Sequence, residues 1–242
     1  MNENPDLTQL PDGLGLMVRV DGTRPLTDLT ALLNAVCDEV ENRAEKSVVV
    51  LRLEPTPADV RAWPGAVAIQ QVNRWERAVR RLERLTAMTI AAARGACGGP
   101  ALDLLLAADF RIGAPDLLLM LPVNDGHFWP GMSVYRLVQH LSLAKARQIV
   151  IWGNDISVDK TLELGLIDQI SEDVAEAVHT ATVLMGRISD QELTIRRLLL
   201  LEAGSADYDD AVGVHLAACD RELRRLQQGA APAAGTPRSN RR

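Results

Sequence analysis

The sequence predicts a layered α/β fold, and two stretches carry this prediction. Residues 16–53 run from a short apolar strand through a helix with one apolar face to a second apolar strand, the pattern of a parallel strand–helix–strand unit. The spacing of apolar residues changes twice within residues 91–112, because a strand of small residues is followed by a glycine-rich turn and then by a short apolar helix. With 242 residues, 47% of them hydrophobic, the chain can form one large domain or one domain with an appendage.

The composition excludes several classes of protein. A formal net charge of −6 and 3% aromatic residues give neither a basic surface nor a stacking surface, so we expect no nucleic-acid partner. The chain has an odd number of cysteines, and they are far apart in sequence: Cys37, Cys97 and Cys219. This pattern is unlike a disulfide framework or a zinc site, so we expect no metal. The first residues lack the regions of a signal peptide, and no apolar run could cross a bilayer. We therefore expect a cytoplasmic protein without a membrane partner.

The first elements follow from apolar spacing. Residues 1–14 are expected to form a flexible lead-in, and residues 16–20 alternate as a strand. After a turn, Thr27 is the predicted N-cap of a helix that extends to about residue 41. Its inner face consists of Leu29, Leu32, Leu33, Val36 and Val40. Residues 47–53 are then a buried strand.

An irregular segment follows this strand, because Pro55 and Pro57 forbid regular pairing over residues 54–60. Loops after parallel strands are where α/β proteins usually place their sites. Residues 68–85 form the next predicted helix, with Trp75 on its inner face and five arginines largely outside. These arginines fit either a CoA phosphate or, more commonly, a solvated helix face.

The glycine turn is the most informative stretch. Residues 88–96 are a predicted strand, residues 97–100 a tight turn and residues 101–108 a buried helix. Such a turn directs free backbone N–H groups and the positive end of the helix dipole at one point, which suits a phosphate, a carboxylate or a transient oxyanion. Pro100 is tolerated in the first helical turn. The alternative is that the two glycines only allow close packing of helix on strand.

The remaining elements are mainly helical. Residues 115–121 are a short apolar strand, and residues 122–131 form a loop rich in polar and aromatic side chains. Further predicted elements are a helix from residue 133, a helix over 142–152, a helix with a short strand over 155–170, and helices over 189–202 and 207–227. Residues 229–242 are expected to be a disordered tail.

Four short motifs resemble the enoyl-CoA hydratase/isomerase (crotonase) superfamily. They are AADFRI at 107–112, Pro130-Gly131 before a helix, WGNDIS at 152–157 and ELGLID at 163–168, in the order and spacing of the family. The resemblance implies a ClpP/crotonase-like α/β fold of repeated β-β-α units with C-terminal oligomerisation helices. It also implies a core domain at residues 15–186, a helical trimerisation region at 187–228, and a homotrimer or dimer of trimers.

The resemblance further implies an acyl-CoA thioester as substrate, with no additional cofactor. The family holds the enolate oxygen with two backbone N–H groups, and the Ala58-Asp59-Val60 step matches the first donor at Ala58. An ungapped count back from Asp109 places the second donor at Pro100, which has no N–H. A shift of one residue places it at Gly99, and Gly99 is the prediction adopted here.

The acid/base positions depart from the family pattern. Asp103 occupies the position of the first glutamate, where it acts either as a proton carrier or as an acid that complements the helix dipole. Val123 occupies the position of the second glutamate and cannot titrate. Asp125 and His127 are candidate substitutes, although His127 also suits a structural donor buried against Trp129. The candidate catalytic residues are therefore Asp103, Asp125 and His127.

Within the superfamily the chain most resembles the DpgB-type hydratase-like proteins of 3,5-dihydroxyphenylglycine biosynthesis. The short loop after residue 53 and the altered glutamates carry this resemblance. It implies help in dehydrating and aromatising a polyketide-CoA thioester to 3,5-dihydroxyphenylacetyl-CoA, beside a type III polyketide synthase. Three alternatives stay open: a non-catalytic CoA-binding or scaffold partner of that synthase, a general enoyl-CoA hydratase/isomerase, and thioester hydrolysis.

Overall fold

The computed structural model describes residues 5–43, 48–57, 61–188, 190–204 and 206–229 of the chain. The chain divides into two compact units, residues 1–190 and 191–242. Among the described residues, no helix is both long and apolar enough to span a membrane. The predicted domain boundaries at residues 14, 186 and 228 stay predictions.

A six-stranded sheet forms the centre of the first unit, in the order β1-β2-β3-β4-β6-β11. β1 is antiparallel to β2, and the other neighbouring strands are parallel. The parallel pairing of β2 with β3 confirms the predicted strand–helix–strand unit. The strands are β1 (Leu7–Gln9), β2 (Gly15–Val20), β3 (Val48–Leu53), β4 (Met88–Ala93), β6 (Phe110–Gly113) and β11 (Gln169–Ile170).

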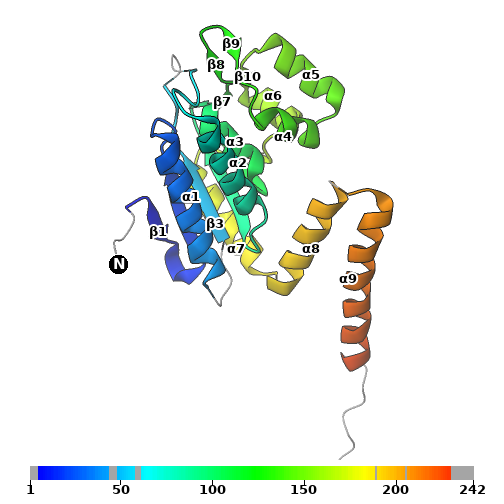
Figure 1. Ribbon diagram of the computed structural model, residues 1–242. Coiled ribbons are helices and arrows are strands. Elements are labelled where there is room, and N and C mark those ends of the chain that lie inside the picture. Colours follow the sequence, from blue (N-terminus) through cyan, green and yellow to red (C-terminus); the bar gives the residue numbers. More distant parts are fainter. Residues whose placement is uncertain (1–4, 44–47, 58–60, 189, 205, 230–242) are drawn as a thin grey trace, which may run out of the picture. The chain divides into compact units, whose positions relative to one another are not determined.

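Helices cover both faces of this sheet. One face packs against α1 (Leu26–Glu41), α2 (Ile69–Glu83) and α3 (Gly99–Ala107), which lie side by side in Figure 1. The other face packs against α7 (Val174–Gly186). Alternate residues of β3 serve the two cores, since Leu51 belongs to the first and Val50 to the second. A parallel strand that is covered on both faces is apolar nearly throughout, and only Arg52 of β3 is exposed.

Smaller elements follow the carboxyl ends of β4 and β6. A three-stranded sheet joins β5 (Ala96–Cys97), β7 (Leu118–Leu119) and β10 (Ile156–Ser157), and a hairpin joins β8 (Val123–Asn124) to β9 (His127–Phe128). The helices of this region are α4 (Ser133–His140), α5 (Leu143–Trp152) and α6 (Val158–Glu163). A short 3₁₀ turn, η1 (Pro11–Gly13), precedes β2. The second unit contains α9 (Tyr208–Gly229) and all but the first residue of α8 (Asp190–Ala203).

Two predicted helix starts are wrong by one or two residues. Thr27 is not an N-cap: α1 begins at Leu26, because the carbonyl oxygen of Pro25 already accepts the N–H groups of Asp28 at 3.0 Å and Leu29 at 3.1 Å. α3 begins at Gly99 rather than at residue 101, so Pro100 lies inside the first helical turn. This arrangement is the one that the choice of Gly99 as a donor requires.

Three other elements differ from expectation. β1 lies within the expected flexible lead-in, because its three residues complete the edge of the sheet on β2. The predicted strand 88–96 ends at Ala93, since Gly95 adopts a φ of +58° and turns the chain into the second sheet. α7, which covers the second face of the sheet, was not predicted from the sequence.

Candidate active site

A cavity of about 390 Å³ opens beside the glycine turn, and we call it the glycine-turn cavity. It lies at the carboxyl ends of β2 and β3, where α/β proteins commonly bind ligands. Its lining is mainly glycine, proline and apolar side chains, and its two arginines are paired. Arg24 pairs with Asp6, and Arg61 donates to Asp155 at 2.5 Å. The walls are residues 22–25, 56, 61–65, 98–100 and 120–122.

The N-terminus of α3 leaves one backbone donor at this cavity. Gly98 is the N-cap residue and has no side chain with which to cap the helix. Pro100 has no N–H, and the N–H of Ala101 bonds to the Gly98 carbonyl oxygen at 3.1 Å. In the described part of the chain, the N–H of Gly99 has no hydrogen-bond partner. The first turn of α3 therefore keeps the Gly99 N–H available for an anionic ligand atom.

Gly99 could not be replaced without strain. Its φ is +53°, a conformation that L side chains rarely adopt. A Cβ at this position would lie 3.2 Å from Cγ of Trp63, so the indole of Trp63 covers the Cα of Gly99. The free N–H and the indole therefore border the same part of the cavity.

Trp63 forms a fixed wall of the cavity, and sequence reasoning missed it. Its backbone N–H donates to Oδ1 of Asn124 at 3.1 Å, and Nδ2 of Asn124 donates to its carbonyl oxygen at 2.8 Å. The N–H of Val123 also donates to the carbonyl oxygen of Arg61 at 3.0 Å. The β8–β9 hairpin thus holds the chain on which Trp63 sits. Trp63 lies in an irregular segment, so no periodic pattern could have identified it.

Thr56 supplies a polar atom of a different kind. Its N–H donates to the carbonyl oxygen of Ala96 at 2.8 Å, and Pro55 and Pro57 flank it, so its backbone is well defined. Its Oγ1 is buried and has no hydrogen-bond partner among the described residues. A buried hydroxyl without a partner is unfavourable by about 1–3 kcal/mol, and a bound ligand or water would remove that penalty.

Asp103 lies in α3 one turn beyond Gly99, and it is only 4% exposed. Nε1 of Trp75 donates to its Oδ2 at 3.0 Å, while its Oδ1 is 3.9 Å from Nη1 of Arg136. Arg136 in turn donates through Nε to Glu83 at 2.6 Å and through Nη1 to Glu76 at 3.2 Å. Asp103 is therefore part of a buried network that joins α2, α3 and α4.

The network sets the protonation of Asp103. Burial, followed by the nearby Glu76 carboxylate, raises the pKa of Asp103 to about 7, although Arg136 and the Trp75 hydrogen bond act in the opposite direction. A carboxyl group with such a pKa is a common feature of functional sites. Asp103 is nevertheless absent from the described lining of the glycine-turn cavity.

Two of the other predicted site residues, Asp125 and His127, do not line this cavity. Asp125 and His127 are exposed at the β8–β9 hairpin, with Asp125 in its turn at a φ of +48°. Neither belongs to the described lining, and His127 is exposed rather than buried against Trp129. Ala58, the predicted first backbone donor, lies outside the described residues. Of the five predicted site residues, Gly99 alone is among the described residues that line the cavity.

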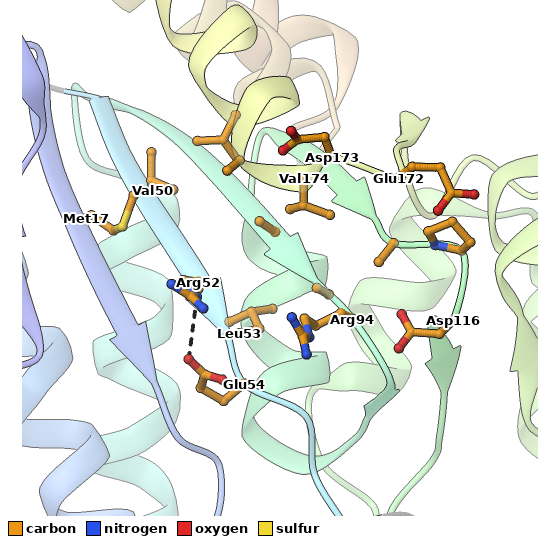
Figure 2. Close-up of a pocket in the computed structure, with 16 residues that line it drawn as sticks. Met17, Val50, Arg52, Leu53, Glu54, Arg94, Asp116, Glu172, Asp173 and Val174 are labelled. Atoms are coloured by element: carbon orange, nitrogen blue, oxygen red, sulfur yellow. Dashed lines mark ion pairs between the residues drawn. The ribbon is translucent and has the colours of Figure 1, made fainter.

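A larger cavity of about 540 Å³ lies at the same edge of the sheet but on the α7 face, and we call it the sheet-edge cavity. Its floor is apolar, and charged side chains surround it. Figure 2 shows Arg52 and Glu54 on one side and Asp116 and Glu172 on the other. Arg52 and Glu54 form an ion pair at 3.5 Å. None of the predicted site residues belongs to its described lining.

Cys37 and Cys97 are buried, whereas Cys219 is exposed. Burial raises the pKa of Cys37 to about 11 and that of Cys97 to about 12, so both thiols are protonated at neutral pH. No group of three or more His, Cys, Asp or Glu side chains in the described part of the chain could hold a metal ion.

The family model and the similar proteins that match this chain indicate the same family. The family model for enoyl-CoA hydratase/isomerase matches residues 67–223. A protein of Amycolatopsis orientalis described as an enoyl-CoA-hydratase is 44% identical over 211 residues, which are 87% of this chain and 96% of that protein.

Solved structures share the fold at low identity. The enoyl-CoA hydratase/isomerase of Cupriavidus metallidurans CH34 has a TM-score of 0.76 at 17% identity, over 90% of this chain and 88% of that one. A Thermobifida fusca YX structure in complex with CoA has a TM-score of 0.71 at 19% identity, over 92% and 95%. The predicted crotonase fold is thus confirmed, and the chain belongs to the enoyl-CoA hydratase/isomerase family.

Proposed function

We propose that the glycine-turn cavity binds the acyl part of an acyl-CoA thioester and stabilises its enolate oxygen. The observation that carries this proposal is the N–H of Gly99 at the N-terminus of α3, which has no hydrogen-bond partner among the described residues. A fixed donor that faces a developing negative charge stabilises it without reorganising. We assign the second donor to Ala58, and the CoA complex of the Thermobifida fusca neighbour supports CoA as the carrier.

The proposed substrate is a polyketide-CoA thioester that the chain helps to dehydrate and aromatise to 3,5-dihydroxyphenylacetyl-CoA. Dehydration removes a proton from the carbon next to the thioester and a hydroxyl from the following carbon, and together they leave as water. In a β-polyketone that proton is already acidic, so stabilisation of the enolate is the main requirement. Val123 in place of a second carboxylate is compatible with this reaction and unfavourable for ordinary hydration.

The test is the product profile of a type III polyketide synthase supplied with malonyl-CoA, with and without this protein, by mass spectrometry. We expect a shift toward the dihydroxyphenylacetyl product. Pro100→Ala would restore an N–H next to that of Gly99, and we expect it to increase the shift, whereas Pro115→Ala, outside the glycine-turn cavity, should not. An unchanged profile in the presence of saturating protein would contradict the proposal.

A second candidate is a non-catalytic partner that binds the thioester or the synthase. The burial of Asp103 and the absence of Asp125 and His127 from the described cavity lining favour it. Under this candidate, calorimetry would detect binding of a CoA thioester or of the synthase while the product profile stays unchanged.

We also propose that the chain forms a homotrimer or a pair of trimers through its last helices. α9 exposes Leu216, Leu223 and Leu226. Exposed leucines that recur on one helix suit burial against another subunit. Light scattering at micromolar concentration tests this assembly, and a monomeric mass would contradict it.

A further inference from the structure

We infer that the solvent-facing side of α5 is the docking surface for α9 of a second copy of this chain, so that the copies join head to tail. The inference rests on the homotrimer proposed above, because it names the surface that receives the last helix. It is independent of the ligand in the glycine-turn cavity.

The solvent-facing side of α5 carries large apolar side chains. Leu143, Ile151 and Trp152 are each 68–74% exposed, although α5 has only ten residues. Leu143 and Ile151 are eight residues apart, so they lie on one face of the helix two turns from each other. Ala146 is the buried residue of α5 and marks its inner face. A short helix with this much exposed apolar surface suits burial against another polypeptide.

A cavity of about 600 Å³ lies beside this face, and Lys145 and Trp152 belong to its lining. The two acidic side chains in the described lining, Asp155 and Glu163, each already pair with a cation. The surface is therefore hollowed, and the positive charge of Lys145 is left available. Interfaces commonly anchor an aromatic side chain of the partner in such a hollow.

The charge of this surface indicates what can cover it. Residues 126–154 contain no Asp or Glu, although the chain has 32 such residues. On α5, Lys145 and Arg147 are exposed, and neither forms an ion pair within the described part of the chain. Two α5 helices placed face to face would bring these cations together, which is unfavourable. A complementary partner therefore carries acidic groups beside apolar ones.

The first half of α9 has this composition. Tyr208, Val212 and Leu216 follow one another at intervals of four residues, so they form one row along the helix. Tyr208 is 81% exposed and Leu216 is 61% exposed. Asp209 and Asp210 lie in the first turn, and the described residues give them no ion pair. An apolar row beside two free carboxylates complements the apolar, cationic face of α5.

The contact joins two different surfaces, and this determines how the copies assemble. A contact between unlike surfaces repeats from copy to copy and closes into a ring where the rotation allows it. A ring of three copies is the proposed homotrimer, and in it each α5 and each α9 would be covered. A contact between like surfaces would instead close after two copies.

The first test is the mass of Ile151→Asp by light scattering at micromolar concentration. We expect the wild type to have the mass of a trimer or a pair of trimers and the variant to fall to the mass of one copy. Ile69→Asp is the matched control, because Ile69 is 72% exposed on α2 and should leave the mass unchanged. A folded Ile151→Asp with the wild-type mass would overturn the inference and leave the homotrimer in place. A monomeric wild type would overturn both.

The second test reverses the charges of the two surfaces. Lys145→Glu combined with Arg147→Glu should lower the association constant by about tenfold or more, measured by sedimentation velocity. Adding Asp209→Arg and Asp210→Arg to the same chain should restore association, because the two reversed surfaces again complement each other. If the chain with all four substitutions keeps its helix content by circular dichroism but does not reassociate, the pairing of α5 with α9 is wrong.

A measurement on the wild type keeps the inference falsifiable if these variants fold poorly. Trp152 is exposed in the single chain and would be covered in the ring. On dilution that dissociates the assembly, we expect the tryptophan emission maximum to move to longer wavelength, and Trp152→Phe should lack most of this shift. A constant emission maximum while the mass falls would overturn the inference.

Discussion

The two cavities at the carboxyl edge of the sheet each lie beside the start of a helix, but the two helix starts differ. At the sheet-edge cavity, the side chain of Asp173 caps α7 by accepting the N–H of Glu176 at 3.0 Å. At the glycine-turn cavity, Gly98 cannot cap α3, and the N–H of Gly99 has no partner among the described residues. The start of α3 therefore lacks the side-chain cap that the start of α7 has. The capacity to bind an anion follows from unsatisfied donors rather than from volume.

The largest expected effect comes from Gly99→Ala, which would add a methyl group 3.2 Å from the Trp63 ring. We expect at least a tenfold loss of phenylacetyl-CoA affinity by calorimetry, which is about 1.4 kcal/mol. Gly153→Ala is the matched control, because Gly153 has a φ of +64° with nothing within 4 Å of its Cβ position. Both variants should lose about 1 kcal/mol of stability from the positive φ. Equal affinities in the two variants would remove Gly99 from the site.

Asp103→Asn should change the pH dependence of stability. Because the pKa of Asp103 is raised from 3.8 to about 7, the folded state retains a proton that the unfolded state loses above pH 4, and this contribution to stability falls as pH rises from about 4 to 7. The variant keeps the other groups that interact electrostatically with this carboxyl group, which are Glu76, Glu83, Arg136 and Cys97.

The difference between the melting temperature of Asp103→Asn and that of the wild type should therefore increase as pH rises from about 4 to 7. About 2–4 °C corresponds to each kcal/mol in a chain of this size. Asp116→Asn, which changes an exposed carboxylate of the sheet-edge cavity, is the control variant. The same slope in both variants would contradict the burial argument.

Asp173→Ala should affect stability and leave binding unchanged. Loss of an N-cap side chain costs about 1 kcal/mol, which urea unfolding can measure. Since Asp173 lines the sheet-edge cavity, we expect phenylacetyl-CoA affinity to stay within twofold of wild type. A larger loss of affinity would mean that the thioester occupies the α7 face, and would reverse the comparison of the two cavities.

The smallest expected effect is that of Thr56→Val, which keeps the shape and removes the unpartnered hydroxyl. We expect equal or slightly higher stability of the free protein, because a buried polar atom is lost. If the hydroxyl bonds to the ligand, affinity should fall about threefold, a typical value for one neutral hydrogen bond. Higher stability with unchanged affinity would confine Thr56 to a structural role.

The sequence was sufficient for the parts of the fold that depend on local periodicity. The apolar spacing of residues 29–40 and the apolar run of β3 identified a parallel unit, and the glycine turn identified the start of α3 within two residues. α7 was missed although Val174, Ala177, Val178 and Ala181 have helical spacing after the N-cap Asp173. These small residues form a weak apolar stripe that only tertiary packing makes decisive.

The site was harder to predict, because its geometry depends on contacts between distant residues. Trp75 was assigned to the inner face of its helix, and a buried indole N–H requires an acceptor, but the sequence does not say which of several acids provides it. Asp103 therefore had two open roles, and only the structure shows the bond to Trp75. Trp63 lies outside any periodic element, and its position depends on Asn124, which is 61 residues away in sequence.

The base and the tip of the β8–β9 hairpin have different roles, because only the base supports the cavity wall. Asn124 makes both bonds to Trp63 at the base of the hairpin, whereas Asp125 and Gly126 form an exposed turn with positive φ values of +48° and +80°. Insertions at such a turn disturb few contacts. The length of this turn can therefore change while the bonds between Asn124 and Trp63 are kept.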